Sequence, residues 1–197
     1  LSENVFVVRG DMRIRAATIS SRVFQKIFDR GRLCTVPLFR DPEGEVLPTA
    51  VGPLAPGRGG FEVQPRCPGD RETATLMPWD YCGIYRRSLH SAIGGFDPAI
   101  SEPWWQKLDY GMRAWLWGEE IRVNSSLKMS YVGTSAPEDV TPSGGYRRFF
   151  LKNLAVRRRG GDASLPVSAW WAYRRGSGDG GAGPREDWKE IRDWVTR

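Results

Sequence analysis

Two stretches of the sequence decide the fold: GGFDP at residues 94–98 and WWQKLDYGMRAWLWG at residues 104–118. In the second stretch, apolar residues recur at steps of three and four, which predicts an amphipathic helix capped by Gly118. The same spacing places Gln106, Asp109 and Arg113 on one helix face. An Asp and an Arg four residues apart either form a structural ion pair or belong to a functional site.

The segments on either side of these stretches alternate between strand-like and helix-like patterns. A strand–helix–strand order near the start of the chain favours a parallel α/β layout. We expect a buried strand at 4–8, a helix at 19–28, a strand at 33–39, a short helix at 88–93 and a strand at 121–131. The Pro- and Gly-rich residues 41–72 are expected to form a long excursion or lid rather than a core element.

An acidic residue follows the first expected strand, in the sequence Arg9-Gly10-Asp11. Open α/β sheets bind ligands at the carboxyl ends of their strands. A carboxylate there can hold a divalent cation that bridges a diphosphate, because such cations prefer oxygen ligands. The alternative for Asp11 is a turn-forming residue without a ligand.

Composition excludes several classes of protein. The chain has 197 residues, 40% of them hydrophobic and 26% charged, which is enough for a core and rules out a wholly disordered chain. No apolar run approaches the roughly 18–20 residues of a membrane helix. One histidine excludes a multi-His metal site, and three widely spaced cysteines form no zinc pattern and favour a reducing compartment.

The formal net charge of +6 is concentrated in one segment, residues 146–176, which contains eight basic side chains and one acid. Aromatic residues are interleaved with these arginines and lysines. Such a segment can bind nucleic acid, anionic lipid or phosphate, or it can be a solvated helix face. We expect a basic helix at 146–159, a flexible linker at 176–184 and a final helix within 185–197.

The two opening stretches, taken with Cys82-Gly83-Ile84-Tyr85-Arg86-Arg87, resemble the second half of a family 2 glycosyltransferase. The resemblance covers roughly residues 1–135 and implies a partial GT-A fold, an α/β architecture with a Rossmann-like mixed sheet and flanking helices. Residues 136–175 would form a helical extension. The half that holds the nucleoside pocket is expected to lie outside this chain, which begins at Leu1.

The resemblance implies transfer of a sugar from a nucleotide-diphosphate donor to an acceptor hydroxyl, in synthesis of a surface glycan. Asp11 would bind the divalent cation, Mn or Mg, that stabilises the leaving diphosphate. Asp109, Lys107 and Arg113 would be the catalytic residues. The acceptor-side contacts would come from Gly94, Gly95, Phe96 and Asp97, with Trp104 and Trp105 stacking on sugars.

Four positions depart from the family pattern. Arg9 replaces the first acid of the Asp-x-Asp metal motif, and Tyr131 lies where some relatives have a metal-binding His. Gln106 and Lys107 replace the Glu-Asp pair that contains the proposed base, and a Lys serves as a base only if burial lowers its pKa. Asp109 or Asp80 is then a replacement base. An Arg and a Lys can also neutralise diphosphate charge in place of a metal.

Two further functions fit the sequence. One is a catalytically silent module that binds sugars or nucleotide sugars through its tryptophans. The other, less favoured, is a basic nucleic-acid-binding module. For the transferase we expect a cytoplasmic location, with residues 146–176 docking at the anionic inner face of the membrane, near lipid-linked acceptors.

Overall fold

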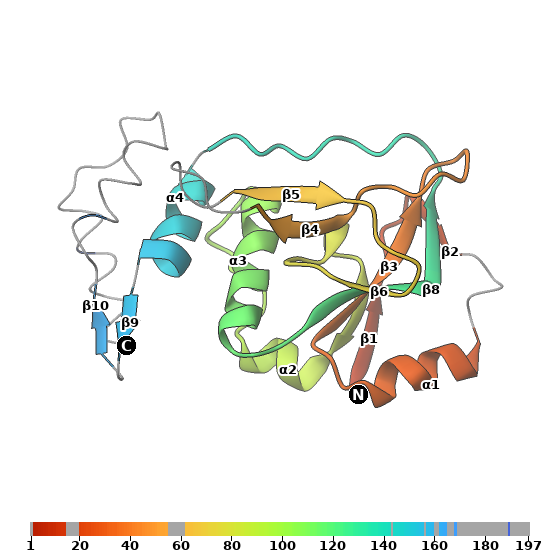
Figure 1. Cartoon of the computed structure of the whole chain (residues 1–197), viewed down its shortest axis with the longest axis horizontal. Helices are drawn as coiled ribbons and strands as arrows, with labels where there is room; N and C mark the ends of the chain where they lie inside the picture. Colours follow the sequence, from red (N-terminus) through yellow and green to blue (C-terminus); the bar gives the residue numbers. More distant parts are fainter. Residues whose placement is uncertain are drawn as a thin grey trace.

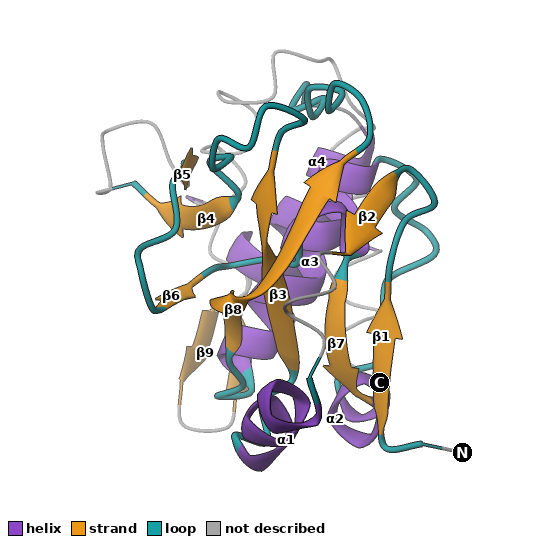
Figure 2. Cartoon of the chain, turned by 90° about the vertical axis from the view of Figure 1, so that its right-hand side faces the viewer, coloured by secondary structure: helices purple, strands orange, loops and turns teal. Residues whose placement is uncertain are grey.

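The computed structural model describes residues 2–14, 20–54, 62–142, 144–155, 157–159 and 162–164, together with residues 168 and 189. Its centre is a six-stranded mixed sheet in the order β1-β7-β3-β8-β2, with β6 also paired to β8 (Figures 1 and 2). The strands of this sheet are β1 (Asn4–Val7), β2 (Met12–Ile14), β3 (Cys34–Arg40), β6 (Glu72–Ala74), β7 (Gly83–Arg86) and β8 (Ile121–Tyr131).

The central pair of strands, β3 and β8, runs parallel, and the other pairings in this sheet are antiparallel. Six of the seven β3 residues are buried and Arg40 at its end is half-buried, as expected of a strand covered on both faces. A register shift between Pro37 and Leu38 bends the pair. The predicted mixed α/β sheet is therefore confirmed, and β8 has the predicted bounds.

The prediction of a buried first strand is wrong, because β1 lies at the edge of the sheet. It pairs with β7, and the burial of its residues alternates. Val5 and Val7 are 44% and 39% exposed, whereas Phe6 packs inward against α1. An apolar run can mark either kind of strand, because a pattern of valines carries no information about neighbours.

Helices cover both faces of the sheet. Helix α1 (Ser21–Asp29), capped by the Ser20 side chain, packs Ile27 against Ile84 and Leu127. Helix α3 (Pro103–Leu116) covers the other face, where Tyr110 joins the core that contains Tyr85. Ile84 and Tyr85 are neighbours in β7, so their side chains point to opposite faces. The short helix α2 (Arg87–Ala92) follows directly.

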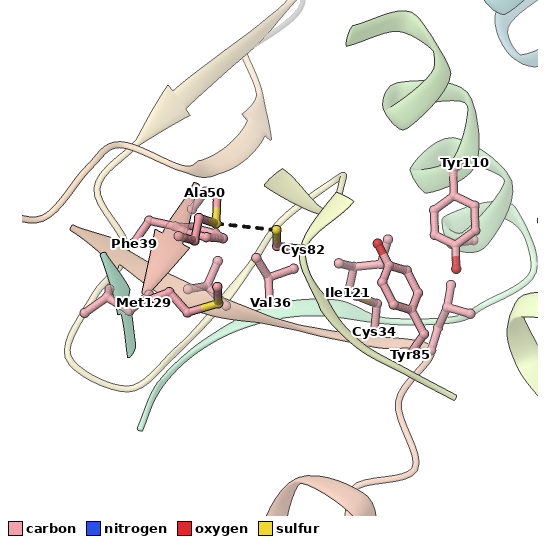
Figure 3. Close-up of a cluster of buried hydrophobic side chains, with 14 of the residues drawn as sticks. Cys34, Val36, Phe39, Ala50, Cys82, Tyr85, Tyr110, Ile121 and Met129 are labelled. Atoms are coloured by element: carbon pink, nitrogen blue, oxygen red, sulfur yellow. Dashed lines mark hydrogen bonds between the residues drawn. The ribbon is translucent and has the colours of Figure 1, made fainter. Parts of the chain in front are cut away.

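The core on the α3 side contains buried apolar residues from β3, β7, β8 and α3 (Figure 3). Two of them are cysteines, Cys34 and Cys82, both reduced. Burial raises the pKa of Cys34 well above its ordinary value and that of Cys82 to about 11. These thiols therefore behave as small apolar side chains.

In the described part of 41–72, residues 49–52 are buried in the core, which corrects the prediction that this segment contains no core element. Strands β4 (Ala50–Pro53) and β5 (Val63–Arg66) form a separate two-stranded sheet. Ala50 and Val51 are fully buried, and Val51 accepts a backbone hydrogen bond from Leu76. The glycines and prolines of this segment therefore do not exclude strands, since Gly52 and Pro53 lie in β4 and Pro65 lies in β5.

Gly111 permits the closest approach between α3 and the chain segment before the short 3-10 turn Trp79–Tyr81. A Cβ atom at this position would lie 1.4 Å from the carbonyl oxygen of Leu76, which belongs to the backbone and cannot rotate away. We expect Gly111→Ala to lower the free energy of unfolding by about 1–3 kcal/mol or more. Urea titration checks this, with Gly133→Ala as control, because nothing lies within 4 Å of that position. Equal stability of the two variants would contradict the packing described.

The basic helix predicted at 146–159 ends earlier than expected. Helix α4 (Gly144–Phe150) continues as a wider π-type turn at Leu151–Ala155, and β9 (Arg157–Arg159) then pairs with β10 (Asp162–Ser164). The predicted linker and the final helix lie outside the described residues. Among the helices in the described ranges, none is long and apolar enough to cross a membrane.

Candidate functional site

A polar cluster forms where four separate segments meet at one end of the sheet. The turn after β1 contributes Arg9 and Asp11, the Trp79–Tyr81 turn contributes Asp80, and the end of β8 contributes Tyr131. Lys107 reaches the same place from α3. Asp11 and Lys107, both predicted as site residues, are thus linked through Arg9 and Asp80. We call these five residues and Glu138 the Asp80 cluster.

Arg9 bridges two carboxylates. Its Nη2 and Nε lie 2.6 and 3.1 Å from the two oxygens of Asp11, which makes a two-pronged pair. Its Nη1 lies 3.1 Å from Oδ2 of Asp80. Partial burial opposes the charge of Arg9, but Asp80 and Asp11 outweigh that effect and raise its pKa.

Asp80 is the centre of the cluster and has a strained backbone. Its φ is 50°, and that of Tyr81 is 60°, a left-handed region that residues other than glycine rarely adopt. The hydroxyl of Tyr131 donates a hydrogen bond to Asp80 and accepts one from Trp79 Nε1 at 3.2 Å. Such strain persists where the surroundings hold it in place, and it is concentrated at functional sites.

Lys107 is the most deeply buried of the charged residues that the Asp80 cluster contains, with 1% of its surface exposed. Its ammonium donates to Glu138 and lies 4.0 Å from Oδ1 of Asp80. It also lies 5.8 and 5.3 Å from the ring centroids of Trp79 and Tyr81. Two carboxylates and two aromatic rings thus hold this charge in an otherwise apolar place.

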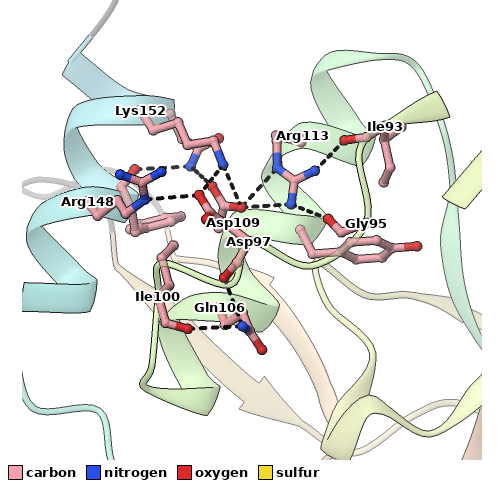
Figure 4. Close-up of polar contacts among 12 residues, drawn as sticks. Ile93, Gly95, Asp97, Ile100, Gln106, Asp109, Arg113, Arg148 and Lys152 are labelled. Carbon is pink, nitrogen blue, oxygen red and sulfur yellow. Dashed lines mark hydrogen bonds and ion pairs between the residues drawn. The ribbon is translucent and has the colours of Figure 1, made fainter. Parts of the chain in front are cut away.

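A second network lies on a different face of α3, two residues along the helix (Figure 4). Its centre is Asp109, whose side chain is fully buried. Asp109 accepts from Arg113 at 2.8 and 2.9 Å, from Lys152 at 3.1 Å and from Asn153 at 2.8 Å. Arg113 also donates to the carbonyls of Ile93 and Gly95.

The second network fixes the turn at residues 94–97 against α3 and the α4 region. Asp97 accepts from Lys152 at 2.8 Å and from Arg148 at 3.0 Å. Gly94 and Gly95 have φ of 85° and 64°, which explains the paired glycines. Asp109 and Arg113 therefore have the contacts of positioning residues, since each is engaged by groups that hold this turn.

The contacts of Asp97 predict that the fold loses stability at low pH. Burial works to raise the pKa of Asp97, but hydrogen bonds from Lys152, the Ala99 amide and Arg148 outweigh that effect and lower it to about 2. A carboxyl with a lowered folded-state pKa stabilises the fold above its ordinary value of 3.8, and that contribution is lost as pH falls toward 2. We expect about 2 kcal/mol of unfolding free energy to be lost across this window.

Unfolding curves at several pH values between about 5 and 2 measure this loss. Asp97→Asn should be less stable than the wild type at pH 6 and should have a shallower pH dependence over that window. An unchanged pH slope in this variant would show that Asp97 is not the group responsible.

The three aromatic residues predicted to contact substrate are differently placed. Phe96 stacks on Tyr110, with ring centroids 4.3 Å apart. Phe96 also lines a small pocket of about 250 Å³, together with Val5, Tyr81 and His90. Trp104 and Trp105 are buried in a core with Ile100 and Phe149, and Trp105 packs on Tyr146.

Sequence reasoning missed four residues of these networks. Glu138 lies in the loop after β8, a region without pattern, and nothing local signals its contact with Lys107. Arg148, Lys152 and Asn153 belong to the segment interpreted as a surface-docking helix, but they turn inward onto Asp97 and Asp109. Asp109 on α3 and Asp97 in the turn before it were the available signal. Acids that become buried need positively charged partners, and the basic segment 146–176 is where such partners could be found.

The described residues do not form an evident divalent-metal site. No group of three or more His, Cys, Asp or Glu side chains in the described ranges could hold a metal ion. The two carboxylates nearest to the predicted position, Asp11 and Asp80, are both bound to Arg9. A cation between them would lie beside a guanidinium, and charge repulsion disfavours that arrangement.

Comparison with known proteins supports the fold. No family model matches the chain, and neither does any curated protein sequence. Among solved structures, the chain is similar to GalNAc-T7 crystallised with UDP, GalNAc and Mn2+, with a TM-score of 0.55 and 12% identity. The match covers 98% of this chain and 38% of GalNAc-T7. The chain therefore has a GT-A-like α/β fold and spans little more than a third of that glycosyltransferase.

Proposed function

We propose that this chain forms the acceptor-side part of a glycosyltransferase that uses a nucleotide-diphosphate sugar, as in family 2. One observation carries the proposal: the Asp80 cluster unites Asp11, Asp80 and Lys107 at the end of a GT-A-like sheet. The likeness to a protein crystallised with UDP and GalNAc supports the substrate class. That structure also contains Mn2+, whereas Asp11 and Asp80 of this chain are both paired with Arg9.

The transfer reaction requires a base, and we assign that role to one residue of the Asp80 cluster. The acceptor hydroxyl oxygen attacks the anomeric carbon, the bond from that carbon to the diphosphate breaks, and a carboxylate takes the hydroxyl proton. We assign the base to Asp80, which lies between Arg9 and Tyr131 in the cluster. Asp109 is fully buried and accepts from three side chains, so we assign it, with Arg113, to holding the 94–97 turn.

The test is an assay of sugar transfer and donor hydrolysis by the full-length protein, with UDP- and GDP-sugars as donors. We expect turnover with at least one donor, and loss of turnover in Asp11→Ala. A protein that binds these donors without hydrolysing or transferring them would be the silent binding module, and the transferase proposal would be wrong. Quenching of tryptophan fluorescence by the donor sugar reports that binding separately.

We further propose that the acceptor is a surface glycan or lipid-linked precursor at the cytoplasmic side of a membrane. The support is the basic segment 146–176, although two of its cations, Arg148 and Lys152, bind Asp97 inside the fold. Docking would then depend on the other basic residues of the segment. Sedimentation with vesicles that contain or lack anionic lipid tests this, and equal binding to both would overturn it. Salt-dependent RNA or DNA binding would instead indicate the nucleic-acid module.

A further inference from the structure

Arg9 lies between two carboxylates of the Asp80 cluster. Its guanidinium contacts the carboxylates of both Asp11 and Asp80, which are the two acids that a cation at this end of the sheet would use. The pair with Asp11 is two-pronged, so the plane of the guanidinium is fixed. Arg9 is therefore a positive charge already held between two site carboxylates.

A guanidinium can take over part of the electrostatic work of a metal ion. A divalent cation between two aspartates gives a net charge of zero, whereas Arg9 between Asp11 and Asp80 gives −1. Lys107, whose ammonium lies 4.0 Å from Asp80, is a second cation here and is itself paired with Glu138. Of these groups only the two cations can offset the charge of a diphosphate, and Arg9 is the one whose side chain reaches solvent.

Arg9 also has donors to spare. A guanidinium has five N–H groups, and the contacts to Asp11 and Asp80 use three of them. The side chain is 48% exposed, so the remaining N–H groups are open to a ligand. Planar guanidinium donors match the oxygens of phosphate groups in pairs.

We propose that the Arg9 guanidinium takes the place of the divalent cation and binds the diphosphate of the donor. The donor-binding part rests on the proposed function, whereas the occupation of the cation position by Arg9 does not. Asp11 holds the guanidinium in its two-pronged pair, and Lys107 adds a second, buried positive charge behind it. Binding of the donor diphosphate is then independent of divalent metal.

The first experiment measures Mn2+ binding by electron paramagnetic resonance, without any nucleotide. Arg9→Asp would place a third carboxylate beside Asp11 and Asp80, and we expect it to bind Mn2+ at least about tenfold more tightly than the wild type. Arg13→Asp is the matched control, because Arg13 is an exposed residue of β2 outside the cluster, and it should bind like the wild type. Circular dichroism confirms that each variant is folded.

Two results would overturn the proposal in this experiment. The first is submillimolar Mn2+ binding by the wild type that is lost in Asp11→Asn. The second is a folded Arg9→Asp protein that binds Mn2+ no better than the wild type. Neither result depends on whether the protein is a transferase.

The second experiment titrates the full-length protein with UDP and GDP in EDTA or in Mn2+. We expect equal affinity in both conditions, and about tenfold or greater weakening in Arg9→Gln. Affinity that requires Mn2+ in the wild type overturns this inference but leaves the proposed function standing. No binding of either nucleotide in either condition overturns the proposed function together with the donor-binding role of Arg9.

Discussion

Replacing Asp109 by Ala lowers the free energy of unfolding by about 3–5 kcal/mol, which is the largest stability effect we expect from one substitution outside the apolar core. The Asp109 carboxylate is fully buried and accepts from Arg113, Lys152 and Asn153. Removing it leaves Arg113 without its carboxylate partner and Lys152 with Asp97 alone, in a largely buried place. The cost of an unpaired buried charge exceeds that of a lost hydrogen bond.

Chemical denaturation measures this loss, and Asp29→Ala on α1 is the control. Asp29 is exposed and accepts a hydrogen bond from Gln25, so its removal should change stability by less than about 0.5 kcal/mol. Asp109→Asn keeps an acceptor for Asn153 but loses the charge, and its stability should fall between those of the other two variants. If Asp109→Ala were as stable as Asp29→Ala, the network around the 94–97 turn would not hold the fold together.

The elements that were predictable from sequence are those whose pattern is local. The apolar spacing of residues 104–118 predicted α3 to within two residues, because one helix face alone determines that pattern. The bounds of β8 were also predicted. The burial of β1 and of β4 was not, since it depends on which strands become neighbours, and that is decided by contacts far along the chain.

The site also has a part that the sequence predicts and a part that depends on contacts between distant residues. Asp11 was identified from its position after a strand. Lys107 was identified as a departure from the family pattern, and Asp80 only as an alternative base beside Asp109. Their meeting depends on pairs separated by many residues, such as Arg9 with Asp80 and Lys107 with Glu138. The excess positive charge of segment 146–176 suggested a surface role. Arg148 and Lys152 instead neutralise buried acids, which a count of charges along the chain cannot distinguish from exposure.

The largest effect on activity is expected from Asp80→Asn, because Asp80 is assigned as the base. Asn has nearly the same shape, tolerates a φ of 50°, and still accepts a hydrogen bond from Tyr131. It cannot take the proton of the acceptor hydroxyl. We expect kcat to fall by about 10²–10⁴-fold, with a much smaller change in the KM for the donor.

Chemical rescue separates a base from a positioning residue at this place. In Asp80→Ala, formate can enter the space left by the side chain and take the proton, so added formate should restore part of kcat. Asp70→Asn, an exposed substitution outside both networks, should keep wild-type turnover and gain nothing from formate. A residue that merely orients Arg9 would give donor binding that weakens in Asp80→Asn and no rescue by formate. Full turnover in Asp80→Asn would show that Asp80 is not the base. Asp11, an acid of the cluster whose side chain reaches solvent, would then be the candidate.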